Sequence, residues 1–107
     1  MSDKVISDTI RMKAKLKQGF TEVKALIKHP MITKGKDIAG NVIEPHFIEK
    51  VTCEHNGNLV MSANWGGGVS TNPYFAFQLE GGKKGDSVKL IWTDNQGNTD
   101  ENITKIK

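Results

Sequence analysis

The sequence predicts an all-β protein, an immunoglobulin-like antiparallel β-sandwich of about seven strands. Apolar and polar residues alternate with a period of two in several segments, which indicates half-buried strands. Turn-forming residues recur at a spacing of roughly ten residues, and no stretch has the period of an amphipathic helix. The Cys–Trp–Cys core of antibody domains is absent, so only the architecture is predicted.

Length and composition favour one folded domain over residues 1–107. The net charge of +3 is too balanced for a nucleic-acid-binding protein. A single cysteine excludes an internal disulfide, and no apolar run approaches the about 20 residues of a membrane span. Met1–Asp8 is polar, is expected to be flexible and does not resemble a signal peptide. Taken alone this indicates a cytoplasmic protein, although a partner with its own signal could carry the chain across a membrane.

The first two strands are predicted at Thr9–Lys17 and Thr21–Lys28. One face of the first is apolar and the other forms a basic row of four residues: Arg11, Lys13, Lys15 and Lys17. That row is either a binding surface or a solvated face whose lysines deter edge pairing. Ile32–Glu44 follows, without a clear period, and is expected to be a long loop or a short irregular hairpin.

The middle of the chain contains the strongest local signal, Asn56-Gly57, which favours a two-residue type I′ turn. The flanking strands, Ile48–His55 and Asn58–Asn64, should therefore pair antiparallel. In the segment from His46 to His55, the face with Phe47, Val51 and Cys53 is expected to enter the core, and Ile48 is expected on the opposite face. Three further strands are expected at Tyr74–Leu79, Ser87–Thr93 and Thr99–Ile106.

A Gly-rich corner, Trp65–Tyr74, is the candidate partner-binding site. Three consecutive glycines cost conformational entropy, and close approach of another backbone would require them. Trp and Tyr are also enriched at interface hot spots. The alternatives are a long hairpin connection, or a Trp that closes the end of the sandwich. The candidate contact residues are Trp65, Gly66, Gly67, Gly68, Asn72, Pro73 and Tyr74.

The sequence offers only weak candidates for a catalytic site or a metal site. Cys53 and His55 share one face of a strand, and a histidine can activate a thiol, but a lone cysteine is more often a small buried side chain. His29, His46 and His55 lack a zinc spacing, so a metal site requires that the fold gather them. We therefore predict a binding module with no catalytic residue, no cofactor and no metal.

The sequence resembles the SoxZ family, the small subunits of the SoxYZ sulfur carrier of bacterial thiosulfate oxidation. The resemblance covers nearly the whole chain and is carried by several short motifs in order: IRMKAKLK, TEVKALIKHPM, PHFIEKVT, EHNG, ANWGGGVSTNPYFAF, GGKKGD and WTDNQG. Each motif is weak alone, and their order makes the match specific.

This resemblance implies a β-sandwich bound to SoxY as a heterodimer, with transient contacts to other Sox enzymes and a homo-oligomer as an option for the isolated chain. In that family SoxY carries the sulfur intermediates on the cysteine of a C-terminal Gly-Gly-Cys-Gly-Gly arm, which this sequence lacks. It also implies a periplasmic location, reached by co-export with SoxY. Cys53 departs from the aliphatic residue expected in that family, which leaves open a disulfide to a partner chain. A second interpretation, from the residues themselves, is a thiol enzyme or carrier that uses Cys53 with His55.

Overall fold

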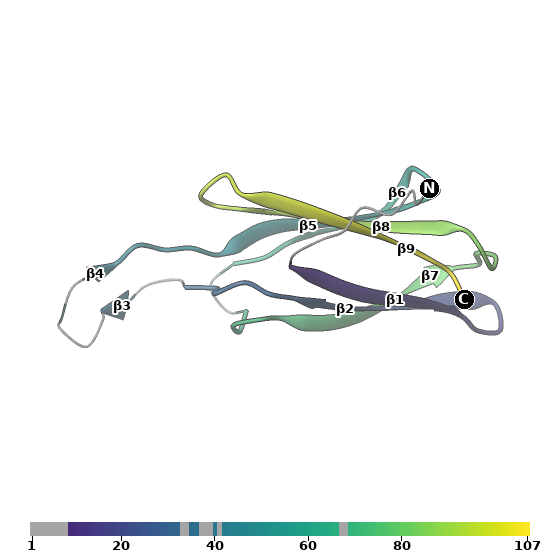
Figure 1. Cartoon of the computed structure of the whole chain (residues 1–107), viewed down its shortest axis with the longest axis horizontal. Helices are drawn as coiled ribbons and strands as arrows, with labels where there is room; N and C mark the ends of the chain where they lie inside the picture. The colour runs from purple at the N-terminus through teal and green to yellow at the C-terminus, as the bar shows by residue number, and fades with distance from the viewer. Residues whose placement is uncertain (1–8, 33–34, 37–39, 41, 67–68) are drawn as a thin grey trace.

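The computed structural model describes residues 9–32, 35–36, 40, 42–66 and 69–107, and within them the chain is all-β. The predicted flexible segment Met1–Asp8 lies outside the described residues. Two antiparallel sheets face each other, which confirms the predicted sandwich (Figure 1). The strands are β1 (Ile10–Leu16), β2 (Phe20–Ile27), β3 (Gly35–Lys36), β4 (Val42–Ile43), β5 (Ile48–His55), β6 (Asn58–Asn64), β7 (Tyr74–Glu80), β8 (Ser87–Asp94) and β9 (Thr99–Lys105).

One layer has the strand order β1-β2-β7 and the other has the order β6-β5-β8-β9. The short strands β3 and β4 pair with each other as a separate hairpin, so the hairpin alternative for the segment Ile32–Glu44 is the one observed. The layers are joined where β1 meets the end of the chain. There Ala14 forms a parallel bridge with Ile106, and the Lys107 amide donates to the Ala14 carbonyl at 3.0 Å.

The core lies between the sheets and is built from the inward positions of each alternating strand. Fully buried side chains include Val23 and Ile27 from one layer and Val51, Val88 and Leu90 from the other. Each such side chain contributes about 1.5–3 kcal/mol on leaving water. The alternation in the sequence therefore predicted the inward faces of β1, β2, β7 and β8 correctly.

Ile48 was predicted on the outer face and is instead fully buried. The pairing of β5 with β8 shifts register between Ile48 and Lys50. This irregularity behaves as a β-bulge, because an extra residue in one strand reverses the facing of side chains on one side of it. Ile48 and Val51 both point inward, three residues apart, while Glu49 and Lys50 stay exposed.

The Asn56-Gly57 hairpin is confirmed. Asn56 has φ 50° and Gly57 has φ 85°, the two positive values that a type I′ turn requires. β5 and β6 pair antiparallel on either side of it, with His55 opposite Asn58.

Within the described residues no helix has the length and apolar character needed to cross a membrane.

Candidate functional site

Hydrogen bonds link the corner Trp65–Tyr74 to the end of β2 and the residues that follow it. The Asn72 amide donates to the His29 carbonyl at 2.9 Å, and the His29 amide donates to Asn72 Oδ1 at 3.0 Å. The Ile27 amide donates to the Pro73 carbonyl at 2.9 Å. Asn72 has φ 50°, a conformation that asparagine tolerates better than most residues. Asn72 and the buried Pro73 therefore position the corner, while Gly67 and Gly68 lie outside the described residues.

Trp65 and Tyr74, the two aromatic residues of the corner, have different surroundings. Trp65 is half-buried and packs edge-on against Phe75, with ring centroids 5.1 Å apart. Its backbone amide donates to the Glu49 carbonyl, and its ring is packed against the core. Tyr74 keeps 61% of its surface exposed. Tyr74 is therefore the corner aromatic that is available to a partner.

Gly66 is exposed and does not have a positive φ. A Cβ built there would meet no other atom within 4 Å. The fold of the described chain thus does not itself require glycine at this position, and space is open for another chain.

Cys53 is fully buried, and burial, helped by the neighbouring Glu54 charge, raises the pKa of its thiol to about 12. The imidazole of His55 is engaged elsewhere, because its Nε2 lies 2.9 Å from Asp86 Oδ2. Reactive cysteines are accessible and have lowered pKa values. The surroundings of Cys53 are therefore those of a core side chain, in agreement with the predicted core face of Phe47, Val51 and Cys53.

The fold brings together two of the three histidines, His29 and His46, around the carboxylate of Asp94. Both Nε2 atoms face Asp94 Oδ2, at 3.1 Å for His29 and 2.7 Å for His46. The other oxygen, Oδ1, accepts the backbone amides of Gln96 and Asn98 at 3.0 and 2.8 Å. His55 is not part of this cluster. Asp94 is the last residue of β8, and through these hydrogen bonds its side chain also stabilises the turn to β9.

The carboxylate of Asp94 is held in its charged form. Burial alone would raise its pKa, but hydrogen bonds from His29, Asn98 and His46 outweigh burial and keep the pKa well below its ordinary value. Asp94 is only 2% exposed, so its charge depends on these donors.

Hydrogen bonding at His29 argues against a metal site in this cluster, although its three ligand atoms lie within 4.8 Å of one another. The Met31 amide donates to His29 Nδ1 at 3.1 Å, so we assign the ring proton to Nε2, which donates to Asp94. A histidine that binds a metal through Nε2 donates its Nδ1 proton to a neighbour, and the Met31 amide occupies that position as a donor. The cluster is therefore a hydrogen-bonded network that holds the end of the sandwich together.

Sequence reasoning missed this network because its members are far apart in the chain. His29 and Asp94 are separated by 65 residues. Only the position of Asp94 at the start of a turn hinted at its capping role, since aspartate at such positions accepts nearby backbone amides.

A comparison with protein families matched the chain, over residues 10–105, to the family described as Sulphur oxidation protein SoxZ. The match covers both sheets and the corner. The comparison with curated proteins gave no match.

Proposed function

The chain belongs to the SoxZ family of sulphur oxidation proteins, and on that premise we propose that it is the non-catalytic subunit of a SoxYZ carrier complex. In this role it binds SoxY and supports the presentation of SoxY's cysteine-bound sulfur intermediates to the thiosulfate-oxidising enzymes. The observation that carries the proposal is the family match together with the burial of Cys53, the sole thiol of the chain.

The alternative, a thiol enzyme or carrier that uses Cys53 with His55, has the geometry against it. A sulfur carrier needs a thiolate that an incoming substrate can reach. Cys53 has no exposed surface, and His55 is bound to Asp86. The same burial disfavours a disulfide between Cys53 and a partner chain.

The proposed partner surface is the corner Trp65–Tyr74, with Tyr74 as its exposed aromatic contact. Large aromatic residues dominate the binding energy of many interfaces. The open space beside Gly66 supports the same location. Export to the periplasm together with SoxY completes the proposal and follows from the family resemblance.

We expect Tyr74→Ala to weaken the complex with SoxY, or to slow thiosulfate oxidation in the reconstituted system, by about fivefold or more. Leu59→Ala is the matched control, because Leu59 is 63% exposed on β6, away from the corner. Both variants should melt close to the unaltered chain, since neither side chain is buried.

Co-expression of the tagged chain with SoxY, followed by affinity purification and cell fractionation, tests the wider proposal. Stoichiometric co-purification, and periplasmic recovery only when SoxY keeps its signal peptide, are expected. Failure of SoxY to co-purify would refute the carrier-complex assignment, whereas equal effects of the Tyr74 and Leu59 variants would refute only the location of the contact.

A further inference from the structure

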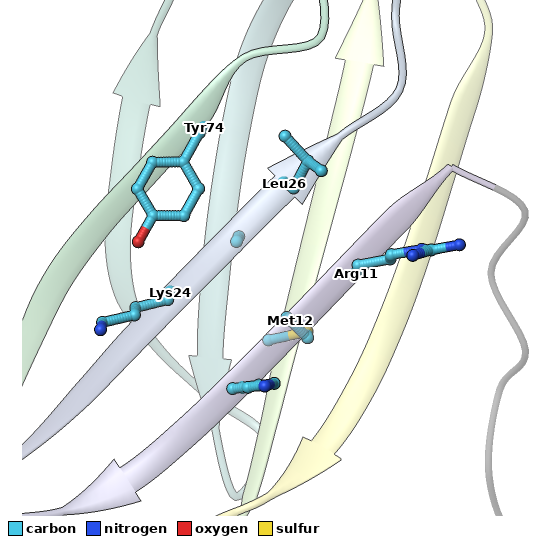
Figure 2. A pocket seen from close by; sticks show the side chains of 7 residues that line it. Arg11, Met12, Lys24, Leu26 and Tyr74 are labelled. Atoms are coloured by element: carbon cyan, nitrogen blue, oxygen red, sulfur yellow. The ribbon is translucent and has the colours of Figure 1, made fainter.

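The outer face of the β1-β2-β7 sheet carries a shallow groove of about 280 Å³. It is lined from three adjacent strands, and the register places its residues side by side. Arg11 is opposite Leu26, Lys13 is opposite Lys24, and Leu26 is opposite Tyr74. Figure 2 shows Tyr74 and Leu26 next to each other at one end, with Lys24 and Arg11 to either side.

Two exposed apolar side chains form the apolar part of this groove. Leu26 is 41% exposed and Tyr74 is 61% exposed, and they are cross-strand neighbours. The other large exposed apolar side chains of the described chain, Leu59 and Val60, lie on β6 in the opposite sheet. A protein partner that covers Leu26 and Tyr74 would gain apolar burial at one continuous spot.

Two of the three cations around that spot have no acidic partner among the described residues. In the described part of the chain, Arg11 and Lys13 form no ion pair, and Lys24 has only a 3.6 Å contact with Glu22 in which both groups are partly exposed. Lys13 and Lys24 face each other directly across the strands, an arrangement of like charges that opposes sheet pairing.

Protection of a sheet edge does not explain these lysines fully. β1 is an edge strand, where lysines deter pairing with other chains. β2, however, is the central strand of its sheet, with β1 and β7 on either side. Lys24 therefore has no edge to protect, and its repulsion with Lys13 would be relieved by carboxylates placed between them.

We propose that this basic groove, formed by Arg11, Lys13, Lys24, Leu26 and Tyr74, binds an acidic segment of a partner protein. Carboxylates of the segment pair with the three cations, and one apolar side chain of the segment covers Leu26 and Tyr74. Charge complementarity selects the occupant, and the open, shallow shape suits an extended peptide better than an enclosed small molecule. The inference goes beyond the proposed function, because it requires neither SoxY nor sulfur chemistry.

The test is a titration of the ¹⁵N-labelled full chain, followed by NMR, with a synthetic peptide in which Asp and Glu residues surround a Phe-Leu pair. We expect saturable shifts concentrated in β1, β2 and the start of β7, which weaken as salt is added. The same peptide with Asn and Gln in place of the acids should not bind.

The double variant Lys13→Glu/Lys24→Glu should reduce affinity for the peptide by about tenfold or more. Lys50→Glu/Lys84→Glu is the control, because both lysines are exposed away from the groove and the change in net charge is identical. If the first variant does not fold, Lys13→Glu alone replaces it, since it places opposite charges across the strands.

Three outcomes would overturn the proposal: equal loss of binding in both double variants, shifts scattered over the whole chain, or displacement of the peptide by thiosulfate at similar concentrations. The last would make the groove a small-anion site. Co-purification of the same variants with SoxY is measured separately, so loss of that complex bears on the proposed function and not on this result.

Discussion

Burial decides the chemistry of the thiol at Cys53. With a pKa of about 12, the thiol would hold about one thiolate per ten thousand molecules at pH 8. The side chain sits among Val51 and Leu90 in the core, so reagents in water also lack a path to it.

We therefore expect the folded chain to react with a thiol reagent at least about a hundredfold more slowly than the chain unfolded in guanidinium. The matched control is Cys53→Ala/Ser62→Cys, which moves the thiol to an exposed position on β6 and should react rapidly when folded. Rapid labelling of Cys53 in the native chain would contradict its placement in the core and reopen the carrier alternative.

At the scale of single elements, the turn of the hairpin β5–β6 requires positive φ at Asn56 and Gly57. A Cβ built at Gly57 or at Gly66 meets no atom within 4 Å, yet only Gly57 has a positive φ. Because neither position is crowded, a comparison of substitutions at the two glycines isolates the cost of backbone strain at Gly57.

Gly57→Val should lower the free energy of unfolding by about 1 kcal/mol or more, because a β-branched residue resists positive φ. Gly66→Val should change it by less than about 0.5 kcal/mol. Chemical denaturation of both variants measures the difference, and equal values would argue against the turn geometry.

Elements were the part of the structure that the sequence predicted best. Alternation located the strands and their inward faces because one face of each strand is buried and the other is not. It failed at Ile48, since a period of two carries no information about an inserted residue, and register with β8 is set by tertiary pairing. The candidate contact residues of the corner stay a prediction, with Tyr74 exposed among them. Its neighbour Leu26, and Lys24 on the same strand, could not be placed beside it from the sequence, because the strand register sets that contact.

At the scale of the whole molecule, Asp94 ties together the end of β2, the segment before β5 and the β8–β9 turn. Its pKa is depressed in the folded chain, so it contributes stability that is present above its unfolded value, near 4, and is lost as pH falls below that value. No local sequence pattern could predict the hydrogen bonds that lower the pKa of Asp94, because their donors come from three separate regions of the chain.

Asp94→Asn should lower the free energy of unfolding at pH 7 by about 3 kcal/mol, because it removes a buried charge from its paired donors. The loss of stability on acidification below about pH 4 should also become shallower. Glu80→Gln, at an exposed position on β7, is the control and should leave both quantities nearly unchanged. If the free energy of unfolding falls equally steeply below about pH 4 in Asp94→Asn and in the unaltered chain, this role for Asp94 is ruled out.

The contact between β1 and the last residues of the chain bears on the order of events during synthesis. The Leu16 amide donates to the Lys107 carbonyl, and the Ala14 carbonyl accepts the Lys107 amide, so these hydrogen bonds of β1 can form only after residue 107 has been added. While the ribosome is still extending the chain, that edge of β1 is open to other nascent strands, because long-range pairing forms late. The exposed basic side chains of β1 disfavour such pairing, because they would place like charges next to one another in an assembled sheet.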